Sequence, residues 1–425
     1  MPEHTLADTR ARHTHMHVIY IHQHFQTRQD CSGTRSYEMA VRLIAAGHEV
    51  TMISGATLGS GDRVGLVGET KSVDVDGIRV IYINEAYDNA LGFWQRVACF
   101  RRFAAKARRA VMDVKANVVF ATSTPLTVGL PGMKVARRLG VPFVFEVRDL
   151  WPELPISMGI IRNPVMKWYL RRMERKIYRA AAHCVALSPG MKEGIAATGY
   201  PSDRITLIPN ASDLELFRPD RSLRKEEWLG DASCCRFVFS GAHGLANGLD
   251  ALIDTAAELN RRGEAGIQFI CVGDGRLKPD HIRRTKELAL ERFLVWHDLL
   301  SKTQFARLLP TFDVGLMLLK NVPGFYNGTS PNKFFDYIAC GLPVLNNYPG
   351  WLAGMIEAHD FGRVVPPDDP GAFADACIWF RDHATERSAM GGRARRYAET
   401  HCSRETMGDH FVKTLEQVVR RWPAT

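Results

Sequence analysis

The sequence predicts an α/β protein with two doubly wound parallel sheets that face a cleft. Short apolar runs alternate with amphipathic segments along nearly the whole chain, the pattern of parallel strands joined by crossover helices. The alternation stops once, in the turn-forming stretch 209–213, and then starts again. A length of 425 residues also exceeds the size that one hydrophobic core usually reaches, so we expect two domains.

The first half is predicted to form one such sheet. A polar loop after the first strand leads to Gly33, which opens an amphipathic helix that ends at Gly47. The predicted strands cover residues 17–21, 49–53, 80–83, 118–121, 142–147, 183–187 and 205–208. We place the first domain at residues 16–205.

The second half repeats the pattern. Strands are predicted at 237–239, 269–272, 293–296, 314–318, 344–345 and 364–365, with a helix from Asn247. We place the second domain at residues 206–403. The run 404–422 has helical spacing and no strand after it, so we expect it to pack back on the first domain.

The composition favours an anionic partner. The net charge of +9 suits a phosphate-rich ligand, a nucleic acid or an acidic membrane surface. The nine cysteines form no Cys-x-x-Cys pair and have no zinc spacing with histidine, so we expect a reduced, cytosolic compartment. The first fifteen residues lack the apolar core of a signal peptide, and no run of 18 or more apolar residues occurs, so membrane contact is expected only at the surface.

Two predicted helices in the first half are strongly basic. In segment 93–112 all charged side chains are positive: Arg96, Arg101, Arg102, Lys106, Arg108 and Arg109. Its predicted apolar stripe contains Phe93, Val97, Phe100, Ala104, Ala107 and Val111, with Trp94 and Phe103 near the borders. The second helix follows Pro164 and carries Lys167, Trp168, Tyr169, Arg171, Arg172, Arg175, Lys176 and Arg179. Each helix alone fits a solvated face about as well as an anionic bilayer, but together they favour membrane contact.

The most informative motif is the segment 330–343. Pro331 in the first turn of a predicted helix, after small polar residues, directs free backbone N–H groups and the positive helix end at one spot, beside Lys333. This arrangement suits a phosphate, and Asp336 one turn later would accept hydrogen bonds from ribose hydroxyls. A plain capped amphipathic helix with Phe334 and Phe335 in the core explains the same spacing about equally well.

Polar residues also follow the predicted strand 142–147, whose carboxyl end should face the cleft. Asp149 or Glu153 would take a proton from an acceptor hydroxyl, and Arg148 would bind a phosphate. An ion pair of Arg148 with a nearby carboxylate is an equally good reading. His22 and His24 follow the first strand, where a histidine is more often a locally satisfied loop residue than a base.

These motifs, taken in order, resemble those of the family-four retaining glycosyltransferases with the GT-B architecture of two Rossmann-like domains. In detail they resemble the subgroup that transfers N-acetylated deoxy sugars, such as N-acetylfucosamine, in bacterial surface-polysaccharide assembly. The resemblance covers nearly the whole chain after residue 16. It rests on Gly33 and on the segments 146–153, 187–191, 208–210, 240–250, 272–275 and 330–336.

The resemblance implies that the second domain binds a nucleoside-diphosphate sugar and that the first binds the acceptor. The donor-binding residues it implies are Gly33, Gly241, Gly244, Asn247, Gly273, Asp274, Thr329, Ser330, Pro331, Asn332, Lys333 and Asp336. The candidate catalytic residues are Arg148, Asp149, Glu153 and Lys333. Gly275 more simply serves a turn between a strand and a helix.

The chain departs from the family pattern at two positions. Asn247 stands where many relatives carry a lysine, which shifts more of the phosphate charge onto Lys333 and the helix dipole. Gly328 stands where the family usually has the first acid of its Glu-x7-Glu pair, and Asp336 fits the second. The missing carboxylate leaves the donor sugar open.

The resulting prediction is a cytosolic enzyme, peripheral on the inner face of the cytoplasmic membrane, that moves a sugar from a UDP-sugar to a polyprenyl-diphosphate-linked saccharide. No cofactor, catalytic metal or nucleic-acid partner is expected. A UDP-sugar epimerase or hydrolase without a lipid acceptor, and a non-enzymatic membrane-associated nucleotide-binding protein, are the alternatives. A nicotinamide-dependent oxidoreductase is disfavoured because no Gly-x-Gly-x-x-Gly follows the first strand.

Overall fold

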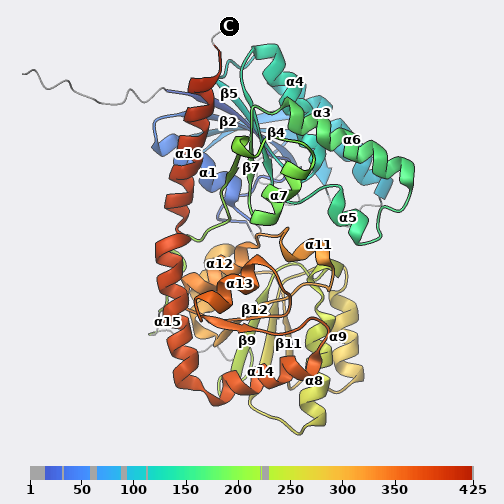
Figure 1. The fold of residues 1–425 in the computed structure, drawn as a ribbon, viewed down its shortest axis with the longest axis vertical. Helices are drawn as coiled ribbons and strands as arrows, with labels where there is room; N and C mark the ends of the chain where they lie inside the picture. Colours follow the sequence, from blue (N-terminus) through green and yellow to red (C-terminus); the bar gives the residue numbers. More distant parts are fainter. Residues whose placement is uncertain are drawn as a thin grey trace, which may run out of the picture.

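The computed structural model describes residues 15–30, 33–57, 65–87, 93–111, 113–220, 222 and 229–423. Within these ranges the protein consists of two parallel-sheet α/β domains, stacked along the longest axis of the molecule (Figure 1). The prediction of two doubly wound α/β domains is confirmed.

The N-terminal domain is built on an eight-stranded sheet in the order β3-β4-β2-β1-β5-β6-β7-β8. Strand β3 is antiparallel to β4, and the other pairings between described strands of this sheet are parallel. The strands are β1 (His17–Ile21), β2 (Glu49–Thr57), β3 (Thr70–Val75), β4 (Ile78–Tyr87), β5 (Val118–Thr122), β6 (Phe143–Val147), β7 (His183–Ala186) and β8 (Ile205–Leu207). The strand order reverses at β1 and β5, whose carboxyl ends therefore flank a crevice, the usual place for a ligand.

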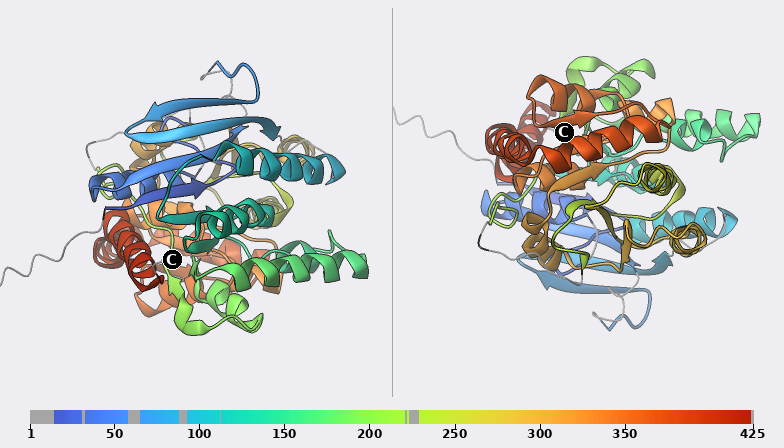
Figure 2. Two further views of the ribbon diagram at one scale, coloured as in Figure 1. Left: turned by 90° about the horizontal axis from the view of Figure 1, so that it is seen from above. Right: turned by 90° about the horizontal axis from the view of Figure 1, so that it is seen from below.

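Helices cover both faces of this sheet, which explains why its central strands are continuous apolar runs. Ile19 and Ile21 face the side covered by α3, α4 and α6, whereas Val18 and Tyr20 face α1 and α16. Figure 2 shows α3, α4 and α6 projecting side by side from one side of the domain. The helices are α1 (Arg35–Ala45), α3 (Phe93–Ala110), α4 (Gly129–Leu139), α5 (Glu153–Ser157), α6 (Pro164–Ala180) and α7 (Pro189–Ala197).

The C-terminal domain contains a six-stranded parallel sheet in the order β11-β10-β9-β12-β13-β14. Its strands are β9 (Cys235–Ser240), β10 (Ile267–Val272), β11 (Leu294–His297), β12 (Val314–Met317), β13 (Val344–Asn346) and β14 (Gly362–Val364). Its helices are α8 (Asp250–Arg261), α9 (Lys278–Glu287), α10 (Lys302–Leu308), α11 (Pro323–Tyr326), α12 (Asn332–Ala339), α13 (Trp351–Ala358), α14 (Pro370–Asp382) and α15 (Ala384–His401). Helices α8 and α14 cover one face, and α12, α13 and α15 cover the other.

The last helix, α16 (Arg404–Arg421), returns to the N-terminal domain (Figure 1). Its Phe411 packs edge-on against Phe120 of β5, with ring centroids 4.9 Å apart. Arg42 of α1 forms an ion pair with Asp409. Helices α15 and α16 therefore run along one side of both domains.

Two sequence predictions need correction. Strand β8 (Ile205–Leu207) pairs with β7, so the first domain extends beyond the predicted boundary at residue 205. In α3, Phe103 is fully buried although it was predicted at the border of the apolar stripe, whereas Phe100 and Ala104 are only partly buried. The side chains of Phe93, Trp94 and Arg96, and residue Met112, lie outside the described part of the chain.

Candidate active site

A cavity of about 240 Å³ opens between the two domains, where the carboxyl ends of their parallel strands meet. The N-terminal domain contributes Arg148 and Asp149, which follow β6. The C-terminal domain contributes Asn247 and the segment 329–333. The structure thus brings eight of the predicted site residues to one cavity: Arg148, Asp149, Asn247, Thr329, Ser330, Pro331, Asn332 and Lys333.

Helix α12 directs its N-terminus at this cavity. Pro331 is the extended residue just before the helix rather than part of its first turn, and Asn332 is the first helical residue. All residues from Phe334 to Ala339 are buried, so the domain encloses the helix on all sides and its start at Asn332 and Lys333 reaches the cavity. Free N–H groups of the first turn are able to hold an anion there.

Lys333 places its ammonium group beside the start of this helix. Its Nζ lies 3.6 Å from the centroid of the Phe239 ring and 3.5 Å from Asn247 Oδ1. A Cβ atom on Gly241 would be 3.2 Å from Nζ, so this glycine leaves room for the amine. Burial lowers the pKa of Lys333 to about 7, because the surrounding protein disfavours the charged form. An anion in the cavity would reverse that shift.

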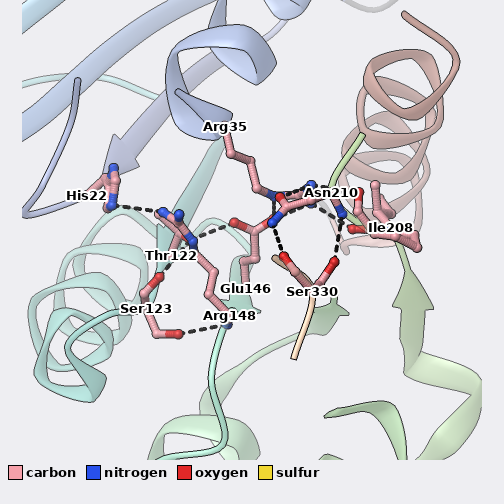
Figure 3. Close-up of polar contacts among 10 residues, drawn as sticks. His22, Arg35, Thr122, Ser123, Glu146, Arg148, Ile208, Asn210 and Ser330 are labelled. Carbon is pink, nitrogen blue, oxygen red and sulfur yellow. Dashed lines mark hydrogen bonds and ion pairs between the residues drawn. The ribbon is translucent and has the colours of Figure 1, made fainter. Parts of the chain in front are cut away.

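Arg148 reaches the cavity from the opposite domain, and Figure 3 shows its guanidinium directed at His22. Its Nη1 lies 3.0 Å from His22 Nε2, and its backbone N–H donates to Ser123 Oγ at 2.9 Å. A guanidinium only donates hydrogen bonds, so Nε2 must accept and the proton of His22 is on Nδ1, 2.7 Å from Ser36 Oγ. His22 is therefore a neutral side chain that orients Arg148.

Both candidate histidines are poor bases in this setting. Burial and the neighbouring charge of Arg148 hold the pKa of His22 well below its usual value. The same two causes lower the pKa of His24 to about 4. Both imidazoles are therefore neutral near neutral pH and bind a second proton weakly.

Asp149 is the carboxylate that faces the cavity. Its Oδ2 accepts a hydrogen bond from Thr124 Oγ1 at 2.9 Å. Burial raises the pKa of Asp149, while the Thr124 hydroxyl and the charge of Arg148 oppose the rise. The group is ionisable, hydrogen-bonded and open to the cavity, which suits proton transfer.

Glu153 does not join this cluster. It lies on α5, its side chain is 48 % exposed, and it forms an ion pair with Arg171 Nε at 2.7 Å. The prediction that placed Glu153 beside the reacting groups is corrected here, because the short helix turns it toward α6.

Asp336 is buried and is not among the residues that line the cavity. Its Oδ1 accepts a hydrogen bond from Ser212 Oγ at 2.8 Å, and the side chain is 7 % exposed. The predicted ribose contact therefore stays a prediction.

The predicted glycines serve different purposes. A Cβ on Gly33 would be 2.9 Å from Asn332 Nδ2, so the first domain approaches the start of α12 closely at this point. A Cβ on Gly273 would overlap the carbonyl oxygen of Gly241, which shows that these two loops pack backbone to backbone. A Cβ on Gly244 would meet no other atom within 4 Å, and Asp274 is exposed.

The sequence prediction missed several residues of the site. The cavity is also lined by Thr124, Leu187, Asn210 and the segment 317–319. Asn210 follows the last strand of the first domain, a position that could have identified it. Its backbone N–H donates to Ser330 Oγ at 3.1 Å and its side-chain Nδ2 donates to the Ser330 carbonyl oxygen (Figure 3).

Within the described ranges, no group of three or more His, Cys, Asp and Glu side chains is arranged to hold a metal ion. A search of the same ranges finds no helix that is long and apolar enough to cross a membrane.

Two family models match the chain, one for each domain. The glycosyl transferase 4-like domain matches residues 32–211, and the glycosyl transferases group 1 model matches residues 235–383. Together these ranges include every predicted site residue.

Individual proteins show the same similarity. A probable glycosyltransferase, WbjE, of Pseudomonas aeruginosa is 26 % identical over 271 residues, which is 61 % of this chain and 65 % of that protein. A GDP-mannose-dependent alpha-mannosyltransferase of Mycobacterium tuberculosis is 24 % identical over 287 residues, 67 % of this chain and 69 % of that protein. The chain thus matches about two thirds of the length of either relative.

The fold is also that of a solved structure, Anabaena HepE in complex with UDP and glucose. The TM-score is 0.71 at 15 % identity, covering 95 % of this chain and 100 % of the other. The chain therefore carries the two domains of a GT-B glycosyltransferase, a glycosyl transferase 4-like domain followed by a group 1 domain.

Proposed function

We propose that the protein is a retaining glycosyltransferase that moves a sugar from a UDP-sugar to a polyprenyl-diphosphate-linked saccharide during surface-polysaccharide or O-antigen assembly. One observation carries the proposal. Lys333 and the start of α12 face the same cavity as Arg148 and Asp149 of the other domain. A diphosphate held on one side and an acceptor hydroxyl on the other is the arrangement that sugar transfer needs.

The groups around α12 would stabilise the departing diphosphate. Preorganised N–H groups and an ammonium group stabilise negative charge that develops as the sugar bond breaks. Lys333 provides the charge that Asn247 lacks, and its amine already lies beside Asn247. On this basis we expect transfer without a catalytic metal or cofactor.

Asp149 would accept the proton that the acceptor hydroxyl loses. It is the described carboxylate on the cavity wall, whereas Glu153 is turned away. In a retaining, same-face reaction a leaving-phosphate oxygen would share this task. Arg148 would neutralise a phosphate of the acceptor or donor.

The donor is proposed to be an N-acetylated deoxyhexosamine carried on UDP. Gly328 leaves no carboxylate for sugar hydroxyls, and a Cβ there would be 2.8 Å from the Gly324 carbonyl oxygen, so the loop has no room for one. A sugar without a 6-hydroxyl and with an acetamido methyl needs fewer polar partners. The UDP complex of HepE supports UDP, and the GDP-mannose-dependent relative makes GDP the alternative to test.

The lipid-linked acceptor is supported by the surface of α6 more than by that of α3. Arg102 and Lys106 of α3 both form ion pairs with Glu85 of the same domain, at 3.0 and 2.9 Å, so a carboxylate already offsets their charge. Along α6, a hollow of about 710 Å³ is lined by Trp168 and six basic residues. The exposed apolar side chains here are Ile160, Val165, Trp168 and Tyr169. Basic and apolar groups together suit the surface of an anionic bilayer.

The test is transfer by the purified full chain with a panel of UDP- and GDP-linked sugars and a polyprenyl-diphosphate-linked acceptor, with products identified by mass spectrometry. We expect UDP-linked N-acetylfucosamine or N-acetylquinovosamine to give a higher kcat/KM than UDP-glucose or UDP-galactose. Turnover of the donor without acceptor would instead indicate an epimerase or hydrolase. Absence of nucleotide binding in calorimetry would remove the enzymatic proposal altogether.

A further inference from the structure

The N-terminal domain contacts the backbone that leads into α12. Ser188 Oγ donates a hydrogen bond to the carbonyl oxygen of Asn327 at 2.7 Å. Gly190, two residues further on, approaches the same carbonyl so closely that a Cβ atom would overlap it. Ser188 is fully buried. It does not line the cavity, so any effect on a ligand must act through Asn327.

The same backbone is anchored in its own domain. Asn327 Oδ1 accepts from the Trp351 backbone N–H at 3.0 Å, and Trp351 Nε1 donates to the Thr329 carbonyl oxygen at 2.7 Å. Ser330 is held by Asn210. Three side chains thus hold the segment 327–330: Trp351 of the second domain, Ser188 of the first domain, and Asn210, which follows the last strand of the first domain.

We propose that Ser188, with Gly190, is a positioning residue through which the acceptor-side domain orders the donor-binding segment. The contact exists only when the domains lie as close as they do here. Closure would therefore complete the donor site, and donor binding would in turn favour closure, because the two processes share one contact. This inference rests on the proposed function.

The chain offers variants that separate this contact from ordinary helix stability. Ser188 also caps α7 by accepting from the Met191 N–H at 3.1 Å. In Ser188→Asp the carboxylate still caps the helix but has no proton to donate to Asn327. In Gly190→Ala the helix propensity improves while the added methyl group meets Asn327. Ser188→Thr keeps both hydrogen bonds and is the matched control.

The experiment measures UDP affinity by calorimetry in the full chain, with the thermal midpoint recorded for each variant. We expect Ser188→Asp and Gly190→Ala each to weaken UDP binding about tenfold, with no change for Ser188→Thr. The midpoint of Gly190→Ala should stay close to that of the wild type, whereas that of Ser188→Asp should fall because a carboxylate replaces a fully buried hydroxyl. The double variant should lose little more than either single variant, because both break one contact.

Wild-type affinity in folded Gly190→Ala and Ser188→Asp would overturn the inference and leave Ser188 as a helix cap. A loss of affinity in Gly190→Ala that only tracks a fall in its midpoint would do the same. Failure of the wild type to bind UDP or GDP would instead contradict the proposed function, so the two failures are distinguishable.

Discussion

Arg35 and Glu146 form an ion pair inside the N-terminal domain, with Arg35 Nη2 2.8 Å from Glu146 Oε1 and side chains only 2 % and 1 % exposed (Figure 3). The guanidinium also donates to the carbonyl oxygens of Ile208 and Pro209, both at 2.9 Å, and to Asn210 Oδ1 at 3.4 Å. Its N–H groups thus bind both the buried Glu146 carboxylate and the segment 208–210 that follows β8. Because Arg35 donates to Oδ1, the amide of Asn210 must turn its Nδ2 toward Ser330.

Removing one partner of this pair should be costly. Glu146→Leu leaves a buried, uncompensated guanidinium, and we expect the free energy of unfolding to fall by about 3–5 kcal/mol. The double variant Arg35→Met with Glu146→Leu should recover part of the loss, because no unpaired charge stays buried, while the carbonyl oxygens of Ile208 and Pro209 still lose their donor. Denaturant unfolding followed by tryptophan fluorescence measures both.

The exposed pair Arg171–Glu153 provides the matched control. Glu153→Leu removes one partner at the surface, where such pairs contribute roughly 0–1 kcal/mol. A Glu146→Leu protein as stable as this control would show that the buried pair does not hold the domain together.

Sequence reasoning identified the strands of both sheets well because buried parallel strands are continuous apolar runs. It missed β3 (Thr70–Val75), whose side chains alternate between exposed and partly buried at the sheet edge. The Asp76-Gly77 turn that joins β3 to β4, with φ values of 52° and 80°, is a hairpin signal that could have revealed it.

The sequence alone could not predict which face of α3 is buried or which residues meet at the site, because both depend on tertiary packing. Apolar residues of α3 lie on two overlapping stripes, and only packing on the sheet decides that Phe103 is fully buried while Phe100 is partly exposed. Glu146 and Arg35 are 111 residues apart, so no local pattern indicates that they pair. By contrast, Lys333 and Arg148 were predicted for the cavity because each follows a recognisable helix start or strand end.

The basic surface of α6 should bind anionic membranes. Changing Lys167, Arg172, Arg175 and Arg179 to Gln should reduce sedimentation with phosphatidylglycerol-containing vesicles, and added salt should have the same effect on the wild type. The control removes as many charges from the C-terminal domain, at Arg261, Arg283, Lys286 and Arg292. Equal loss in both variants would mean that net charge matters rather than this helix.

Thr124 should tune the acidity of Asp149. Its hydroxyl lowers the pKa of Asp149, so Thr124→Val should raise that pKa. If Asp149 takes the proton of the acceptor hydroxyl, the acidic limb of the kcat/KM profile of Thr124→Val should lie at higher pH than that of the wild type. The acidic limb of Thr124→Ser should stay in place. If the acidic limb of an active Thr124→Val enzyme does not shift, the proton acceptor is instead an oxygen of the departing phosphate.

Lys333 should link nucleotide affinity to pH. Its pKa is lowered to about 7 by burial, so above pH 7 the free protein carries a neutral amine and must take up a proton to hold a diphosphate. We expect UDP affinity to fall as pH rises from 6 to 9, with proton uptake visible in calorimetry in buffers of different ionisation enthalpy. Uridine, which lacks the diphosphate, should show no such dependence.

Lys333→Met supplies the control and a second, independent readout. It should bind UDP more weakly at pH 6 and with little pH dependence. The folded pKa of about 7 lies below the ordinary value of 10.5, so the unfolded chain binds more protons between these values and wild-type stability gains from rising pH. Lys333→Met should therefore be the more stable protein at pH 6, and its advantage should shrink above pH 7. An advantage that is constant with pH would mean that Lys333 titrates normally and that its ammonium is not confined at the cavity.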